Sequence, residues 1–255
     1  MNNLLMDNSN VEMNQLLNYT LHLADTNLIL AQRNGECCAY GPILEQDIAI
    51  TNITLDLLGQ ARNFYQYAAL ITGNNATEDS LAYLRTEREY KNLLITEIPD
   101  IDWAQIVLRQ FFYSVYQYEV FKHLQTGADI QLAAIAEKSI KETTYHVKWS
   151  SEWVIRLGDG TTESFEKINN ALQNIWQYTG EFFIPADYEK NFIDYSTIKE
   201  KWISKIKIVL EEANLKVPEN IFMQTGGKTG IHTEHMGFIL SDMQYLQRTY
   251  PGAEW

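Results

Sequence analysis

The chain has 255 residues, of which 45% are hydrophobic and 21% charged, and this composition excludes intrinsic disorder over most of its length. Its 33 acidic residues outnumber the 20 basic ones and give a formal net charge of −13, which repels nucleic-acid phosphates and anionic membrane surfaces. We therefore expect neither nucleic acid nor a membrane as a partner.

The cysteines and the first residues of the chain indicate a cytoplasmic protein. Cys37 and Cys38 are the only cysteines, and adjacent cysteines rarely form a disulfide because the loop between them would be strained. Residues 1–10 are polar and rich in Asn, without the regions of a signal peptide, and we expect them to form a disordered tail. No apolar run reaches the about 20 residues of a membrane span.

Apolar residues recur every three or four positions, which predicts helices rather than strands. Proline is absent from the long stretches between Pro42, Pro99 and Pro185, so long helices can continue there. In chain order, the predicted helices cover residues 11–33, 43–71, 77–96, 103–124, 129–157, 162–183, 196–212 and 233–248. Residues 214–232 form an extended linker and a Gly-rich loop before the last helix. Together these elements predict one all-α domain over residues 1–255.

Two of the predicted helices carry few charges and are therefore expected at the centre of the domain. These are residues 43–71 and residues 103–124. The first of them also carries a polar stripe beside its apolar one, made of Asn52, Asp56, Gln60 and Asn63. Polar groups on a buried helix need hydrogen-bond partners, so we expect this stripe to find them inside the bundle.

The predicted helix over residues 129–157 separates its faces sharply. Its lysines share the outer face, while Glu142 and His146 share the opposite face with Trp149 and Trp153. Four long helices with a carboxylate and an imidazole aimed at the axis are the geometry in which ferritin-like proteins hold two iron ions. The predicted fold is a ferritin-like four-helix bundle with additional helices.

A di-iron site of this kind requires Glu-x-x-His pairs, and the sequence contains none. The residues three positions before the five histidines are Tyr19, Val120, Thr143, Thr229 and His232. Glu142 is followed at the third position by Tyr145, and His146 comes one residue late, which turns its side chain by about 100°. We therefore predict no metal site, no other cofactor and no catalytic residue in this chain.

A residual polar core is expected in place of a metal site. Its members are Asp56, Glu119, Glu142 and His146. We interpret Glu142 and His146 as buried, hydrogen-bonded groups with Asp56 or Arg62 as a partner, and Glu119 as exposed or paired. In the alternative interpretation, the four residues are the atypical ligands of a binuclear-metal oxygenase that acts alone.

Three other patterns carry weaker hypotheses. His232 and His235 have a spacing that occurs at metal sites but lack further ligands. The segment 226–230 resembles a phosphate loop, but the position five before Gly227 is Phe222, so the P-loop spacing fails. A basic cluster could hold the phosphates of coenzyme A, and this is a third possible function. The cluster consists of Arg85, Arg88 and Lys91.

Several long segments resemble the structural C subunit of phenylacetyl-CoA epoxidase. The resemblance covers nearly the whole chain after the first dozen residues. The segments that carry it are residues 47–63, Lys141-Glu142 with Tyr145-His146, and residues 225–237, 243–248 and 251–255. Members of this family have a ferritin-like fold, so the resemblance implies the same fold here.

The resemblance also implies a role and partners. In this family an A subunit holds the di-iron centre and binds phenylacetyl-CoA, and the C subunit is its scaffold. With a reductase and smaller subunits, the complex inserts one oxygen atom from O₂ into the aromatic ring during aerobic phenylacetate catabolism. The expected function is thus that of a non-catalytic structural subunit in a hetero-oligomeric monooxygenase, with the di-iron centre in the partner.

Overall fold

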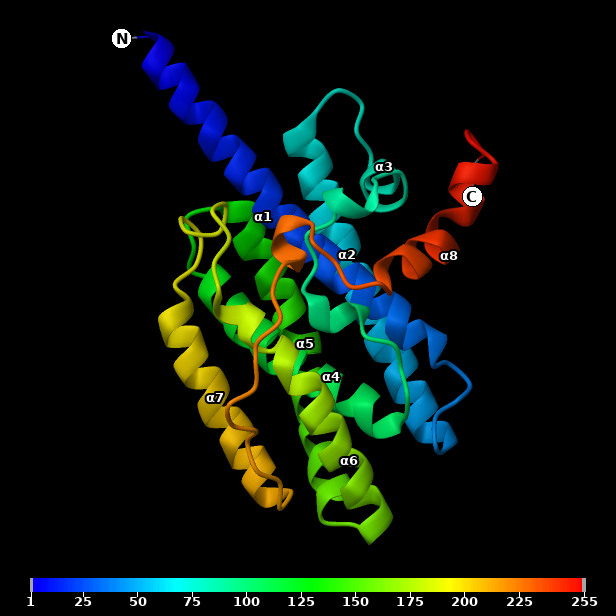
Figure 1. Ribbon diagram of the computed structural model, residues 1–255. Helices are drawn as coiled ribbons and strands as arrows, with labels where there is room; N and C mark the ends of the chain where they lie inside the picture. The colour runs from blue at the N-terminus through cyan, green and yellow to red at the C-terminus, as the bar shows by residue number, and fades with distance from the viewer. Residues whose placement is uncertain (1, 254–255) are drawn as a thin grey trace.

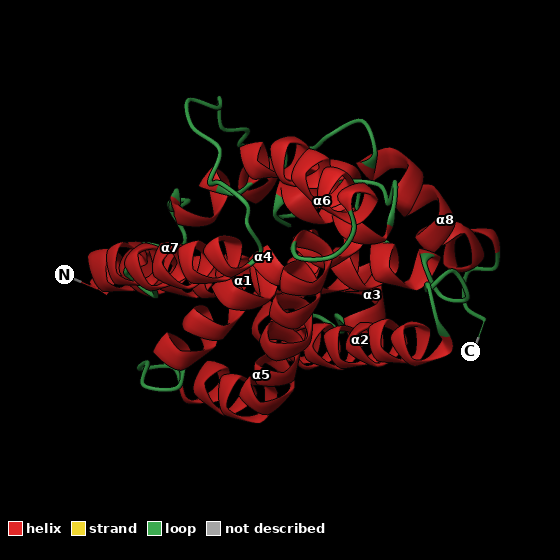
Figure 2. Cartoon of the chain, turned by 90° about the horizontal axis from the view of Figure 1, so that it is seen from below, coloured by secondary structure: helices red, strands yellow, loops and turns green. Residues whose placement is uncertain are grey.

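The computed structural model describes residues 2–253, which form helices and connecting loops without a β-strand (Figure 2). The α-helices are α1 (Asn2–Glu36), α2 (Leu44–Thr72), α3 (Glu78–Tyr83), α4 (Trp103–Leu124), α5 (Ile130–Gly158), α6 (Thr162–Ile175), α7 (Tyr195–Glu212) and α8 (Met236–Thr249). Five short 3₁₀ helices lie between them: η1 (Glu87–Glu89), η2 (Leu94–Glu97), η3 (Trp176–Tyr178), η4 (Gly180–Phe183) and η5 (Gly227–Thr229). No helix of this described part is long and apolar enough to cross a membrane.

Four long helices make up the central bundle. Helix α1 packs along α2, α4 packs along α5, and α2 and α5 join the two pairs. Helices α6 and α7 pack against the α4–α5 pair, whereas α8 contacts α3 and lies apart from them (Figure 1). The predicted fold class, an all-α ferritin-like bundle with additional helices, is confirmed.

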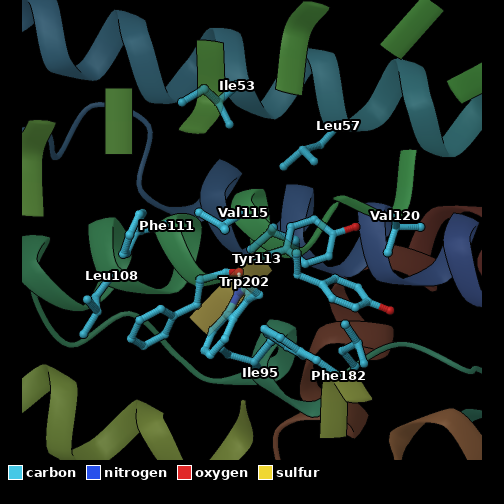
Figure 3. Packing of buried hydrophobic residues seen from close by; sticks show 14 of the residues in the cluster. Ile53, Leu57, Ile95, Leu108, Phe111, Tyr113, Val115, Val120, Phe182 and Trp202 are labelled. Atoms are coloured by element: carbon cyan, nitrogen blue, oxygen red, sulfur yellow. Dashed lines mark hydrogen bonds between the residues drawn. The ribbon is translucent and has the colours of Figure 1, made fainter. Parts of the chain in front are cut away.

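The core lies where the apolar stripes of these helices meet. Ile53 and Leu57 of α2 and Phe111 of α4 are fully buried, in agreement with the low charge of both helices (Figure 3). Trp202 of α7 packs against the ring of Phe112, and its Nε1 donates a hydrogen bond of 3.0 Å to the carbonyl oxygen of Phe112. A tryptophan buried this deeply needs such an acceptor for its indole N–H.

The predicted helix over residues 77–96 is wrong beyond its first turns. Helix α3 ends at Tyr83, and the backbone is extended at Thr86 before the single turn of η1. Long-range contacts explain the difference, because the buried Arg85 guanidinium pairs with Asp25 of α1. The segment 92–97 is also buried, and a continuous helix could not place both parts against α1.

Two further boundaries differ from the sequence prediction. The helix expected over residues 162–183 ends at Ile175 and continues as η3 and η4. The tail expected over residues 1–10 is helical from Asn2 on, and Met1 lies outside the described residues. Residues 2–10 contain no Gly or Pro, so no helix-breaking residue separates this segment from the rest of α1.

Two glycines on the long helices provide a matched test of this packing. A Cβ atom at Gly158 would lie 2.1 Å from the carbonyl oxygen of Ala213, whereas one at Gly59 would meet no atom within 4 Å. We expect Gly158→Ala to lower the free energy of unfolding by about 1–3 kcal/mol. Gly59→Ala should raise it by about 0.5–1 kcal/mol through helix propensity. Urea denaturation followed by circular dichroism measures both, and equal effects would contradict the close packing at Gly158.

Candidate functional site

A buried polar network lies on the axis of the bundle, with one residue from each long helix. Nε2 of Gln117 on α4 lies 2.6 Å from Oδ1 of Asn27 on α1 and 2.9 Å from Oε1 of Gln60 on α2. The hydroxyl of Thr143 on α5 lies 3.4 Å from Oε1 of Gln117. All four side chains are buried, and hydrogen bonds to the Leu23 and Ser139 carbonyl oxygens complete those of Asn27 and Thr143.

The sequence positions of this network follow the pattern of a di-iron site. Such a site takes one residue from each of two helices and a pair three residues apart from each of the other two. Asn27 and Gln117 are the single residues here, and Gln60 is followed three residues later by Asn63. Thr143 is followed three residues later by His146. Amides and a hydroxyl therefore stand where a di-iron protein has carboxylates.

This donor set does not fit a di-iron centre. Iron ions bridged by carboxylates need anionic oxygen ligands, whereas Asn27, Gln60, Gln117 and Thr143 are neutral. The amide hydrogens of Gln117 are already directed at Oδ1 of Asn27 and Oε1 of Gln60, which a metal would need. Among the side chains that the structure describes, no three of His, Cys, Asp or Glu are grouped so that they could hold a metal ion.

The predicted polar core residues lie at the edge of this network or away from it. Nε2 of His146 lies 3.0 Å from Oδ2 of Asp56, and Nδ1 of this buried histidine has no partner. Glu142 accepts a hydrogen bond of 2.9 Å from Nε2 of Gln60. Glu119 faces α7 instead, with its carboxylate 3.6 Å from Nζ of Lys201. Asp56, Glu142 and His146 thus lie together where α2 meets α5, and Glu119 lies apart from them.

Arg62, the other partner considered for His146, binds elsewhere. Its Nε donates to Oε1 of Glu78 on α3 over 2.8 Å, so it pairs with a neighbouring helix. Sequence reasoning missed Asn27 and Gln117, which carry the centre of the network. The sequence did contain a signal, because Gln60 and Asn63, like Thr143 and His146, have the three-residue spacing of di-iron ligands. A search that accepted any polar residue at those positions would have detected it.

The Gly-rich loop binds a carboxylate of the chain itself. The N–H groups of Gly226 and Gly227 donate to Oε1 of Glu181 over 2.8 and 2.7 Å, and the N–H of Leu94 donates to its Oε2. Burial raises the pKa of Glu181, and these three N–H groups act against that rise. Backbone amides that could bind a phosphate are therefore occupied.

His232 has the same kind of internal partner. Its Nδ1 lies 2.7 Å from Oε1 of Glu97, and the N–H of Thr233 donates to the other oxygen of that carboxylate. Burial alone would lower the pKa of His232, but the hydrogen bond and charge of Glu97 outweigh it and raise the pKa. His232 thus attaches the C-terminal segment to the segment around Glu97 and Tyr90.

The basic cluster considered for coenzyme A is not assembled. Arg85 is buried and bound to Asp25, which also accepts a hydrogen bond of 2.8 Å from the backbone N–H of Lys91. Burial lowers the pKa of the Lys91 ammonium. Arg88 alone of the three is exposed. These residues tie the segment after α3 to α1 and do not form a phosphate site.

The fold and its axis define a ferritin-like helical protein with neutral amides and a hydroxyl at the centre of the bundle. Residues 5–255 match the family described as "Phenylacetic acid catabolic protein", and the chain belongs to that family. It is 45% identical over 249 residues to the C subunit of 1,2-phenylacetyl-CoA epoxidase from Escherichia coli K12. The alignment covers 95% of this chain and 100% of that relative, which confirms the family resemblance of the sequence.

The central position of Gln117 can be tested by Gln117→Leu. The substitution leaves buried Oε1 of Gln60 without a donor, and Oδ1 of Asn27 keeps only the Tyr113 hydroxyl, so the free energy of unfolding should fall by about 1–3 kcal/mol. Gln66→Leu, on the exposed face of α2, is the control and should change it by no more than about 0.5 kcal/mol. Equal unfolding midpoints in urea for the two variants would show that the network contributes nothing to stability.

The raised pKa of His232 predicts a pH-dependent contribution to stability. A group whose pKa is higher in the folded state stabilises that state below its unfolded pKa, and the contribution is lost as the pH rises through the folded pKa. The difference in melting temperature between the native chain and His232→Gln should therefore be larger at pH 5.5 than at pH 9. A difference that grows toward high pH would contradict this sign.

Proposed function

We propose that this chain is the non-catalytic structural subunit of a phenylacetyl-CoA 1,2-epoxidase, a monooxygenase of aerobic phenylacetate catabolism. In this role it scaffolds the catalytic A subunit, which holds the di-iron centre, and it works with a reductase and further subunits in the cytoplasm. The observation that carries the proposal is the neutral network of Asn27, Gln60, Gln117 and Thr143 on the bundle axis.

Two findings support this role together. The chain belongs to a family of phenylacetic acid catabolic proteins, and its relative from Escherichia coli is the C subunit of the epoxidase. The bundle axis carries amides and a hydroxyl that are joined through Gln117. A bundle stabilised in this way keeps its shape without iron, as a scaffold for a metal-containing partner requires.

The first experiment is the iron content of the chain expressed alone in iron-replete medium. We expect no stoichiometric iron in this chain, and about two irons per chain in the catalytic subunit expressed in the same way. Turnover of phenylacetyl-CoA should require both subunits and the reductase. About two irons per chain here, with turnover in the absence of the catalytic subunit, would establish the alternative of an oxygenase that acts alone.

The hydrogen bond between Asp56 and His146 provides a second test. Asp56→Leu removes the partner of a buried imidazole nitrogen and should lower the free energy of unfolding by about 1–3 kcal/mol. Asp56→Asn, which retains a hydrogen-bonding side chain, should have a smaller effect. Turnover per assembled complex should stay at the native value in both variants. An intact complex that has lost turnover would place Asp56 in the chemistry and contradict the scaffold role.

A further inference from the structure

The outward face of α2 exposes a row of large apolar side chains. Leu44, Ile48, Leu55 and Leu58 have exposed fractions of 70, 50, 60 and 39%. At about 100° per residue, their spacing of four, seven and three places all four on one side of the helix. The half-buried Thr51 stands between Ile48 and Leu55 on this side. A helix of a monomeric protein normally carries polar residues here, so four exposed large apolar side chains indicate a contact surface.

A pocket between α2 and α3 continues this row. It has a volume of about 310 Å³, and Leu58 lies both in the row and in the pocket wall. The other apolar wall residues include Leu28, Ala61 and Ala82, with Tyr65 and Tyr83 beside them. Pockets of this kind at protein interfaces receive one anchoring side chain of the partner.

The backbone of α2 is accessible at the same place. A Cβ atom added at Gly59 would meet no atom within 4 Å, so the space above Gly59, next to Leu55 and Leu58, is open. A partner helix could approach α2 closely at this point, because no side chain of this chain separates the two backbones.

The rim of this surface is acidic. Glu45 is exposed at the start of α2, and Glu78 and Asp79 stand at the pocket between α2 and α3. Arg62 is the basic residue of the pocket wall and already pairs with Glu78. In a symmetric pair of identical chains this acidic rim would face itself, which costs free energy. The charges therefore favour a different protein with basic residues beside an apolar helix.

We propose that the α2 face, formed by Leu44, Ile48, Leu55, Leu58 and the adjoining pocket, is the docking surface for an apolar helix of the catalytic subunit. Basic side chains flanking that helix meet Glu45 and Asp79, and one anchoring side chain fills the pocket. This inference rests on the proposed function, since it takes the catalytic subunit as the partner.

The test uses the full-length chain and the purified catalytic subunit, with the dissociation constant measured by isothermal titration calorimetry. Leu55→Glu and Ile48→Glu should each weaken binding by about 30-fold or more, because each buries a charge in the apolar contact. Phe238→Glu on α8 is the matched control, because that side chain is 72% exposed and apolar but lies on another element. It should change the dissociation constant by less than about twofold. Circular dichroism melting curves of all variants verify that they are folded.

The acidic rim has a separate readout. Asp79→Lys should slow association with the catalytic subunit several-fold, and high salt should remove the difference between this variant and the native chain. A second copy as the occupant would give the opposite result, since Asp79→Lys would then strengthen self-association in sedimentation experiments.

The outcomes separate the two proposals. If all α2 variants bind the catalytic subunit as tightly as the native chain does, the proposed docking surface is wrong and the scaffold role is unaffected. The same conclusion would follow if Phe238→Glu weakened binding of the catalytic subunit and the α2 variants did not. A native chain that does not bind the catalytic subunit would overturn both.

Discussion

The hydrogen bonds of Gln117 to Asn27 and Gln60 are the constraint on which the bundle depends. A side-chain amide offers both donors and acceptors, so amides from facing helices can satisfy one another in the absence of water or metal. Carboxylates at the same positions would repel one another unless a metal neutralised them. The neutral set therefore fixes the spacing and rotation of the four helices with groups that this chain alone provides. Because an unpaired amide in the core would cost free energy, competing arrangements of the helices are disfavoured.

Buried carboxylates connect the last third of the chain to this bundle in a different way. Glu181 accepts N–H groups from the Gly-rich loop and from Leu94, and Glu97 binds His232. Each of these carboxylates thus joins segments that are distant in the sequence, and each is satisfied by several donors. The segment between α7 and α8 contains only the single turn of η5, and Glu181 and Glu97 hold it at two points. Motifs that suggest a phosphate loop or a metal pair in the sequence are explained by these attachments.

Much of the fold follows from the sequence, and the cross-helix contacts do not. The long helices α2, α4 and α5 lie within two residues of their predicted bounds, because their apolar residues recur at helical spacing and few glycines or prolines interrupt them. Gln60 and Asp56 of the predicted polar stripe bind partners on α4 and α5, whereas Asn52 of the same stripe is exposed. Periodicity cannot tell which residues on other helices complete the contacts, so Asn27 and Gln117 were missed. The prediction for the segment after Tyr83 failed for a related reason, since the ion pair of Arg85 with Asp25 overrides the local helical pattern.

Helix α2 connects the interior of the bundle with its surface. Gln60 and Asp56 bind inward partners on α4 and α5, while Leu55 and Leu58 on the same helix face outward. Because α2 is one continuous helix, the rotation that sets the inner hydrogen bonds also sets the direction of the outer leucines. The specific polar contacts inside the bundle therefore give α2 a defined outer face, and a defined face is the property that binding to a partner protein requires.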